Sequence, residues 1–371
     1  MCRKRLLSAL AGSLLMLGSF AAAVDACTGI RLSAKDGSTV YGRSMEWGTF
    51  DLNSRVTIIP RGYAFAGLTP DGQNGRKWLA KYGIVALDML ERDVLADGMN
   101  EKGLAVGMFY HPGFASYQEY DRKQTDNTIT AVDVVAYILS QYATIEEVKS
   151  AMKSVRVVSV VEKVLGIPIQ AHWMVTEPSG KSIVIEYLDN TLRIFDNPLG
   201  VITNAPGYDW HMTNLRNYVN LSAVAIPTRK IEGMNFAPLG GGSGMIGLPG
   251  DFTPPSRFVR AVAWSQTARP LENSGEATYE LFRILDNFNV PLGAAEGSDR
   301  AKAMLKGMRS STIWTTGWDT SKKVLYFHTQ NNRRVRMVQM DRIDFSGKEI
   351  VHIPLDDKKE QDIKDITPGK K

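Results

Sequence analysis

Hydrophobic and polar residues alternate from Cys27 onward in the pattern of β-strands that bury one face. The alternation covers 27–32 and 38–45, and Lys35-Asp36-Gly37 between the two runs is typical of a turn. A further alternating run covers 55–60. We therefore expect an antiparallel hairpin that begins at Cys27 and is followed by a third strand.

Turn residues and helical spacing extend this prediction over the rest of the chain. Asp97-Gly98 and Asn100-Glu101-Lys102-Gly103 predict turns next to a strand over 104–110. Helices are expected at 131–142, 145–152, 257–267 and 279–287, and strands at 172–176, 183–187, 192–195, 311–314 and 324–329. Strands and helices thus come in groups, which favours an α+β fold of antiparallel sheets covered by helices. No internal repeat or Pro/Ser-rich linker divides the chain, so we expect one large domain over 27–355.

Residues 1–26 have the layout of a secretory signal peptide. Positions 3–5 are basic, 6–24 are mainly apolar, and Val24-Asp25-Ala26 fits a small-residue cleavage site. We expect cleavage after Ala26 and an exported protein, periplasmic or secreted, with no stable membrane insertion. Two other interpretations stay open, a lipoprotein anchored through Cys27 and a signal that is retained as a membrane anchor.

Removal of this segment changes the charge and the cysteine count. It takes away three basic residues and one acidic residue, so the formal net charge falls from +5 to +3. The chain then has no basic footprint for nucleic acid, and 356–371 is expected to be a charged, solvated tail. Cys2 is lost as well, so Cys27 is the single cysteine and no intramolecular disulfide can form.

A cysteine at a new N-terminus suggests a nucleophile that carries its own base. None of the five histidines lies in a cysteine-protease context. A free α-amino group has a pKa of about 7.7–8 and can accept the proton of the thiol. The thiol itself starts at a pKa of about 8.5, and a cation lowers that value. Arg43, on the second strand of the hairpin, is the candidate for this cation.

Several blocks of sequence, in a fixed order, resemble the choloylglycine hydrolase and penicillin V acylase family. Its members are linear amide C–N hydrolases of the N-terminal-nucleophile type. Each block is short, but the ordered set is specific. The blocks are Cys27-Thr28-Gly29-Ile30, 41–47 (YGRSMEW), 97–104 (DGMNEKGL), Thr203-Asn204-Ala205-Pro206, 209–218, 247–251 (GLPGD) and Pro255-Ser256-Arg257-Phe258.

The resemblance implies a role for each matching residue. Cys27 matches the nucleophile, Arg43 the arginine beside it, and Arg257 a second active-site arginine. Asn204 matches the side-chain donor to the oxyanion, and Tyr110 falls where the family places the backbone donor. Without the resemblance, these last three would be interpreted as a helix-capping arginine, a turn asparagine before proline and a core tyrosine.

Glu46 departs from the family pattern, which has aspartate at this position to orient the nucleophile's amine. The carboxylate is kept and is one methylene longer, so Glu46 is expected to have the same role. Trp47 follows directly, and Trp47 and Tyr110 are expected to line an apolar acyl pocket.

The resemblance also implies a four-layer αββα sandwich and a homo-oligomer, a tetramer. The expected substrate is a small molecule with an apolar acyl group and a small polar amine, such as a conjugated bile salt, penicillin V or an N-acyl homoserine lactone. Hydrolysis requires no cofactor, and no metal is expected because no ligand set has suitable spacing. The alternative is a lipid-anchored, non-catalytic periplasmic binding protein with Cys27 as the lipid attachment site.

Overall fold

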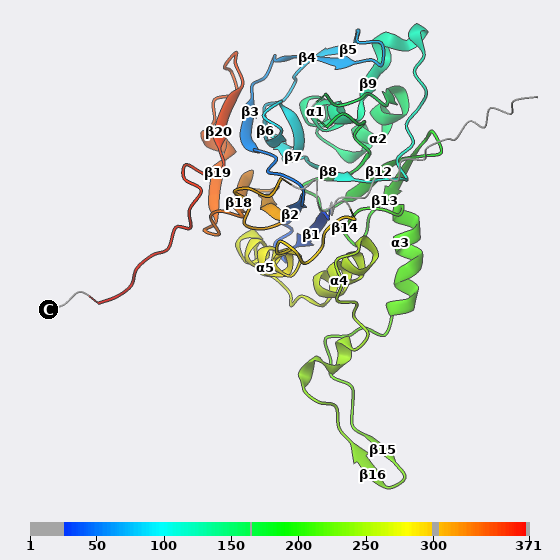
Figure 1. Ribbon diagram of the computed structural model, residues 1–371, viewed down its shortest axis with the longest axis vertical. Coiled ribbons are helices and arrows are strands. Elements are labelled where there is room, and N and C mark those ends of the chain that lie inside the picture. Colours follow the sequence, from blue (N-terminus) through cyan, green and yellow to red (C-terminus); the bar gives the residue numbers. More distant parts are fainter. Residues whose placement is uncertain (1–25, 164, 299–303, 369–371) are drawn as a thin grey trace, which may run out of the picture.

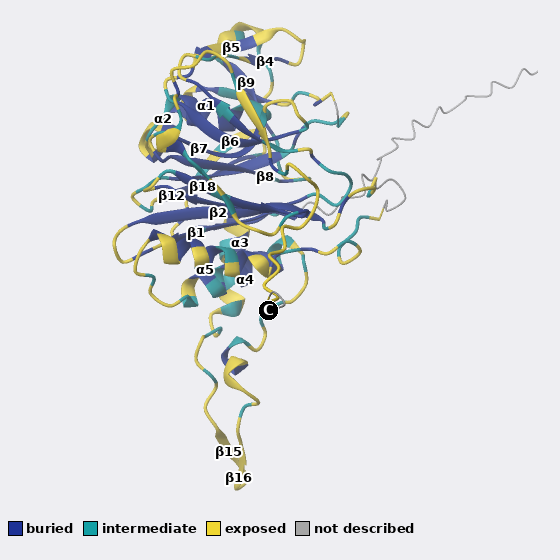
Figure 2. Cartoon of the chain, turned by 90° about the vertical axis from the view of Figure 1, so that its left-hand side faces the viewer, coloured by how far each residue is buried: buried dark blue, intermediate teal, exposed yellow. Residues whose placement is uncertain are grey.

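Two antiparallel β-sheets pack face to face, and helices cover the outer face of each. The structure is a computed structural model that describes residues 26–163, 165–298 and 304–368. Figure 2 shows the four layers from the side, with buried residues concentrated in the two sheets. This is the αββα arrangement that the resemblance implies. Residues 1–25, which hold nearly all of the expected signal peptide, lie outside the described part.

The six-stranded sheet contains the start of the described chain. Its strands, in spatial order, are β14 (Val201–Ile202), β1 (Thr28–Ser33), β2 (Thr39–Glu46), β17 (Thr312–Asp319), β18 (Val324–Thr329) and β19 (Arg336–Gln339). The expected hairpin is β1 and β2, and in it Gly29 pairs with Arg43. Every residue of β2 and β17 is buried, because these central strands are covered on both faces.

The eight-stranded sheet forms the second inner layer. Its strands, in spatial order, are β13 (Thr191–Asp196), β12 (Ser182–Leu188), β11 (Ala171–Thr176), β8 (Ala105–Tyr110), β7 (Val94–Asn100), β6 (Ile84–Met89), β3 (Arg55–Ile59) and β20 (Val351–Pro354). After β20, Asp356 accepts hydrogen bonds from Thr329 and Arg336. The chain beyond it is exposed, but Lys359 pairs with Asp51 and Asp362 pairs with Arg334. The last described residues run away from the body (Figure 1).

The helices begin where the sequence supplies groups for their first turn. Helix α1 (Val134–Gln141) packs on β7 and β8, and α2 (Ile145–Ser154) begins with a capping box of Thr144 and Glu147. On the other side, α4 (Pro254–Thr267) starts with proline in its first turn, and Asn273 caps α5 (Ser274–Asp286). No described helix is both long and apolar enough to span a bilayer.

Asp97-Gly98 does not form the predicted turn, because both residues lie inside strand β7. The carboxylate of Asp97 is buried between the sheets, where Tyr41, Thr316 and Trp318 donate hydrogen bonds to it. Gly98 is needed for close packing, since a Cβ there would come within 2.8 Å of the Ala86 side chain. The turn at 100–103 is confirmed, with Gly103 at φ +84°.

An arm projects from the body between helix α3 (Tyr208–Asn214) and α4 (Figure 1). It carries the short hairpin β15 (Arg229–Ile231) and β16 (Met234–Phe236). Apolar side chains cover this arm without burial by the described chain. They are Val219, Val224, Ile231, Met234, Phe236, Leu239 and Ile246, each at least half exposed. The remaining short strands are the hairpin β4 (Ala64–Leu68) and β5 (Asn74–Leu79) and the parallel pair β9 (Thr128–Thr130) and β10 (Arg156–Val158).

Candidate active site

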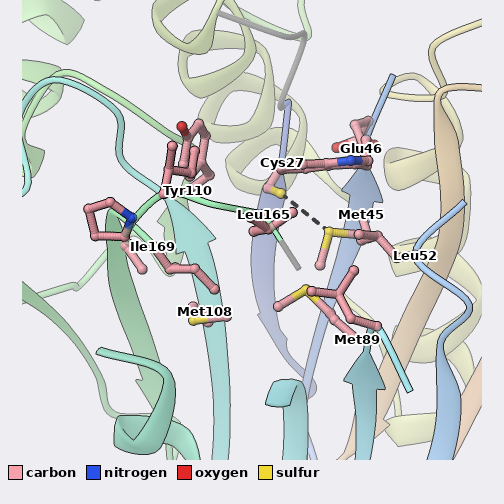
Figure 3. A pocket seen from close by; sticks show the side chains of 14 residues that line it. Cys27, Met45, Glu46, Leu52, Met89, Met108, Tyr110, Leu165 and Ile169 are labelled. Carbon is pink, nitrogen blue, oxygen red and sulfur yellow. Dashed lines mark hydrogen bonds between the residues drawn. The ribbon is translucent and has the colours of Figure 1, made fainter. Parts of the chain in front are cut away.

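Cys27 lies directly before β1, at the mouth of a pocket between the two sheets. It is 3% exposed, and its Sγ is 3.8 Å from Sδ of Met45 (Figure 3). Its backbone nitrogen, which is bonded to Ala26 in the uncleaved chain, donates a hydrogen bond of 2.8 Å to Oδ1 of Asn204. The thiol and the nitrogen of Cys27 are thus both oriented by neighbouring side chains.

Asn204 follows β14 and is held by three groups. Its Oδ1 accepts hydrogen bonds from the nitrogen of Cys27 and, at 2.6 Å, from Nη2 of Arg257. Its Nδ2 donates to the carbonyl oxygen of Tyr110 at 2.7 Å. Because both acceptor bonds are on one side, the orientation of the amide is defined, and the second hydrogen on Nδ2 is left for a ligand.

Arg257, on the first turns of α4, connects Cys27 to Asn204. Besides Asn204, its guanidinium binds the carbonyl oxygen of Cys27 at 2.5 Å and Oγ1 of Thr28 at 3.0 Å. Complete burial lowers the pKa of Arg257 to about 10, while the charges of Glu46 and Cys27 oppose this shift. Arg257 therefore stays charged at neutral pH.

Arg43 is also fully buried, but the side chain of Met45 lies between its guanidinium and the thiol of Cys27. Its guanidinium donates to the carbonyl oxygens of Met108 and, at 3.3 Å, Ala96, and is 3.6 Å from Sδ of Met45. Met45 thus contacts both Arg43 and Cys27. Burial raises the pKa of the Cys27 thiol, and the charge of Arg43 acts against this rise without cancelling it. The cation has the expected direction of effect, while the net shift in the uncleaved chain is upward.

Glu46 ends β2 next to Cys27 and is completely buried. Its Oε1 accepts a hydrogen bond of 3.1 Å from Oγ1 of Thr312. Its Oε2 is buried and accepts no hydrogen bond of normal geometry from the described residues. Burial raises the pKa of Glu46 to about 7, and the charge of Arg257 limits the rise. Among the described residues, Ser44 is a second side chain whose hydrogen bonding lowers the pKa of this carboxyl group.

The pocket beside Cys27 has an apolar lining (Figure 3). Three methionines, Met45, Met89 and Met108, contribute to it. Trp47 and Tyr110 also line it and pack edge to face with their ring centroids 6.1 Å apart. The further lining residues are Cys27, Glu46, Leu52, Leu90, Leu165, Ile167, Pro168, Ile169 and Ala171.

The structure brings all seven sequence-predicted site residues into one region and adds others that the sequence did not reveal. Met45, Thr312 and Asp97 contact or stabilise Cys27, Glu46 and Arg43. Met45 and Asp97 stand in the matching blocks without an assigned role, and Thr312 lies outside every block. A group of buried histidines behind Asn204 was also missed. The sequence analysis noted only that none of the histidines lies in a cysteine-protease context.

Two face-to-face antiparallel sheets between helices, with the one described cysteine at the start of the first strand, define the class of αββα amide hydrolases. Comparisons with known proteins agree with this class. The pattern of the linear amide C–N hydrolases, choloylglycine hydrolase family, matches residues 27–353. The bile salt hydrolase/transferase of Clostridium perfringens is 32% identical over 333 residues, which are 87% of this chain and 95% of that protein.

Solved structures show the same relationship. The conjugated bile acid hydrolase of Clostridium perfringens superposes with a TM-score of 0.78 at 30% identity, covering 92% of this chain and all of that one. The penicillin V acylase of Agrobacterium tumefaciens gives 0.70 at 25% identity, covering 88% and 91%. The chain therefore belongs to the choloylglycine hydrolase family and is a linear amide C–N hydrolase. The alternative of a non-catalytic binding protein has no support among these relatives.

Proposed function

We propose that the protein is exported, is cleaved after Ala26, and hydrolyses an amide through Cys27 as its N-terminal nucleophile. The single observation that carries this proposal is the 2.8 Å contact between the nitrogen of Cys27 and Oδ1 of Asn204. This contact supports the proposal, because cleavage after Ala26 would turn this nitrogen into an α-amine beside the proposed oxyanion donor and the thiol. The match to the family also begins at residue 27, the first residue after the proposed cut.

The proposed reaction has two steps. The α-amine takes the proton of the thiol, and the thiolate attacks the amide carbonyl carbon. Nδ2 of Asn204 and the backbone N–H of Tyr110 stabilise the oxyanion. The tetrahedral intermediate collapses to a thioester as the amine leaves with a proton from the α-amine, and water activated by the same amine then releases the acid.

The charged residues around Cys27 support these steps. Oε2 of Glu46 is the acceptor for the α-amine once cleavage has given it more hydrogens. Arg257 holds the carbonyl of Cys27 and the amide of Asn204, so it positions the nucleophile and the oxyanion donor together. Arg43 lowers the cost of forming the thiolate through the polarisable sulfur of Met45.

The lining of the pocket supports an apolar acyl group. Besides Cys27, only Glu46, Trp47 and Tyr110 bring a side-chain nitrogen or oxygen to its described lining. Hydroxyl groups on a steroid would have few partners there, and a buried unpaired hydroxyl costs about 1–3 kcal/mol. The pocket therefore favours the aryl-ether acyl group of penicillin V or the acyl chain of an N-acyl homoserine lactone over a conjugated bile salt.

The exposed arm supports a homo-oligomer, and we propose a tetramer. Met234, Phe236 and Leu239 are 60%, 52% and fully exposed on the hairpin and the loop after it. Apolar residues gathered on a projecting segment are typical of a protein–protein interface. A second copy of the chain is the partner, as expected from the resemblance.

The first prediction concerns processing and turnover together. N-terminal sequencing of the exported protein is expected to begin Cys-Thr-Gly-Ile, with no lipid adduct in the intact mass. The purified protein is then assayed for amine release from penicillin V, N-acyl homoserine lactones and conjugated bile salts. Cys27→Ala is expected to abolish release from every substrate while the unfolding temperature stays near that of the wild type. An N-terminus at Met1, a diacylglyceryl adduct, or turnover by Cys27→Ala would contradict the proposal.

A further inference from the structure

Three of the five histidines gather behind Asn204, on the side away from the pocket. His111, His172 and His211 are at most 2% exposed, and Glu186 is completely buried with them. His111 directly follows β8, His172 lies on β11, Glu186 on β12 and His211 on α3. These elements are separated along the chain, so the four residues meet only in the folded protein. The proposed reaction gives none of them a task.

Two of these rings bind the backbone on either side of the Asn204 side chain. Nε2 of His172 is 2.9 Å from the carbonyl oxygen of Thr203, and Nε2 of His211 is 2.9 Å from that of Asn204 itself. A carbonyl oxygen only accepts, so each ring must be the donor through Nε2–H. The two peptide groups that flank the Cα of Asn204 are thus each fixed by a buried imidazole.

Glu186 connects the two histidines. Its Oε1 is 2.8 Å from Nδ1 of His172. Both of its oxygens also accept from the backbone nitrogen of Tyr208, at 3.0 and 3.2 Å. Tyr208 is the first residue of α3, the short helix that carries His211. One carboxyl group therefore sets the position of His172 directly and that of His211 through the helix start.

His172 makes two hydrogen bonds to oxygen atoms, and each of them needs one hydrogen. A neutral imidazole supplies one of these hydrogens, and an ionised Glu186 supplies none. Burial lowers the pKa of His172 to about 3 and raises the pKa of Glu186. Both directions favour a neutral pair, with the acid proton of Glu186 donated to Nδ1 of His172.

The same residues do not have the geometry of a metal site, although ligand atoms of His111, His172 and Glu186 lie within 4.8 Å of one another. The rings of His111 and His172 are stacked, with centroids 4.1 Å apart and planes inclined by 4°. A zinc ion lies about 2.0–2.1 Å from each imidazole nitrogen and in the plane of its ring. Two parallel rings cannot both satisfy this condition for one ion.

We propose that Glu186, His172 and His211 are positioning residues that hold the amide of Asn204 where the oxyanion forms. The inference rests on the proposed function of Asn204. A displacement of about 1 Å in a catalytic group can cost roughly 10²-fold in rate. Asn204 lies on a loop, where such a displacement can occur. The hydrogen bonds from His172 and His211 to the backbone carbonyls on either side of its Cα oppose this displacement.

The test is the substitution His172→Phe, which keeps a flat ring for stacking and removes both hydrogen bonds. We expect kcat to fall roughly 10–10²-fold at unchanged KM. The rate at which iodoacetamide alkylates Cys27 is expected to stay at the wild-type value, because the nucleophile is not affected. A substrate-derived aldehyde, which forms a tetrahedral oxyanion on Cys27, is expected to bind more weakly by the same factor as kcat. Binding of the carboxylic acid product is expected to remain unchanged.

Matched variants separate positioning from stability. Glu186→Gln, whose amide can donate to His172 and accept from Tyr208, is expected to keep kcat near wild type, whereas Glu186→Ala is expected to behave like His172→Phe. His328→Phe is the control, since His328 is 4% exposed and packs on Phe282 on α5, in a different part of the fold. Its kcat is expected to be that of the wild type. If His172→Phe does not fold, His211→Phe removes the second backbone contact and receives the same assays.

The inference is overturned if kcat per alkylatable thiol and aldehyde affinity stay at wild-type values in His172→Phe and His211→Phe while the unfolding temperatures fall. That result would make the cluster a contribution to stability alone. A wild-type protein that releases no amine from any substrate would instead contradict the proposed function itself. The two failures are therefore distinguishable.

Discussion

Three ionisable side chains are completely buried around the thiol of Cys27. They are Glu46, Arg43 and Arg257. A buried charge is costly unless an opposite charge or hydrogen bonds compensate it. Here the charge of Arg257 stabilises ionised Glu46, and that of Glu46 stabilises ionised Arg257. Removal of one partner leaves the other without compensation, so isosteric substitutions are the informative ones.

Glu46→Gln is expected to impair catalysis although the shape of the side chain is nearly kept. An amide accepts a weaker hydrogen bond from the α-amine than a carboxylate does. It also removes a negative charge that favours the protonated amine, so the apparent pKa of the amine should fall. The measurement is kcat/KM against pH, in which the acid limb of the variant is expected at lower pH than that of the wild type.

Glu46→Asp is the control for this substitution. It restores the family's usual residue and keeps the charge, so its rate is expected to lie much closer to wild type than that of Glu46→Gln. Superimposable rates and pH profiles for wild type and Glu46→Gln would contradict the orienting role. Glu46 would then be a structural partner of Arg257.

Sequence motifs singled out most of the residues that the structure gathers around Cys27, because these residues stand in ordered blocks. The contacts that hold them in place could not be predicted in this way. Asp97 meets Thr316 and Trp318 only because β7 and β17 face each other across the interior. Likewise, the contact of His172 with Thr203 depends on how β11 packs against the loop after β14. Contacts between sheets leave no local pattern in the chain.

At the scale of elements, β7 brings a carboxylate into the space between the sheets. Oδ1 of Asp97 accepts from Tyr41 at 3.1 Å, and Oδ2 accepts from Thr316 at 2.6 Å and Trp318 at 2.7 Å. Burial nevertheless raises the pKa of Asp97 to about 6, against the charge of Arg43 and these hydrogen bonds. Strands from both sheets are therefore linked through a group that titrates in the folded protein.

This shift gives a prediction for stability against pH. A usual aspartate pKa of about 3.9 in the unfolded chain means that, between about pH 4 and pH 6, the folded state binds more protons at Asp97. The contribution of Asp97 to the free energy of unfolding therefore falls as pH rises through this window and is constant above it. Asp97→Asn removes this titration, so its stability should fall less steeply with pH.

Urea unfolding of wild type and Asp97→Asn at intervals between pH 4 and pH 7 is the measurement. The slopes are expected to differ by up to about 1.4 kcal/mol per pH unit, the value for one proton. The variant is also expected to be less stable at each pH, because an amide cannot accept all three hydrogen bonds. Parallel curves would mean that Asp97 is ionised throughout this range in the folded protein.

The alternation of hydrophobic and polar residues predicted the ends of β1, β2 and β3 to within one residue. Strand β6 was missed because Ile84–Met89 is buried at every position, and a continuous apolar run has no period of two. The turn predicted at Asp97-Gly98 was wrong for a related reason. Asp and Gly favour turns at the surface. Here Asp97 is a buried hydrogen-bond acceptor, and Gly98 allows close packing against Ala86.

At the scale of the whole molecule, the arm is distinctive because no described residue buries its apolar side chains. The triple substitution Met234→Ser, Phe236→Ser and Leu239→Ser is expected to reduce the proposed tetramer to smaller species, because it removes the apolar surface that we propose a second copy covers. Light scattering after gel filtration measures the mass. Leu79→Ser, at a residue 63% exposed on the opposite end of the body, is the control and is expected to leave the mass unchanged. A monomer in the wild type would contradict the proposal.

The spatial order of the six-stranded sheet also bears on when the proposed nucleophile, the thiol of Cys27, becomes competent during synthesis. Strands β1 and β2, which are made first, pair with β14 and β17, and Arg257 binds the carbonyl of Cys27 from 230 positions away. Pairings this distant along the chain form slowly, since a long loop must close before they are made. Until the ribosome has delivered helix α4, Cys27 has no arginine at its carbonyl and no placed asparagine beside its nitrogen. A nascent chain cut early at Ala26 would therefore carry an ordinary thiol, open to oxidants, until helix α4 has been made and has packed against β1.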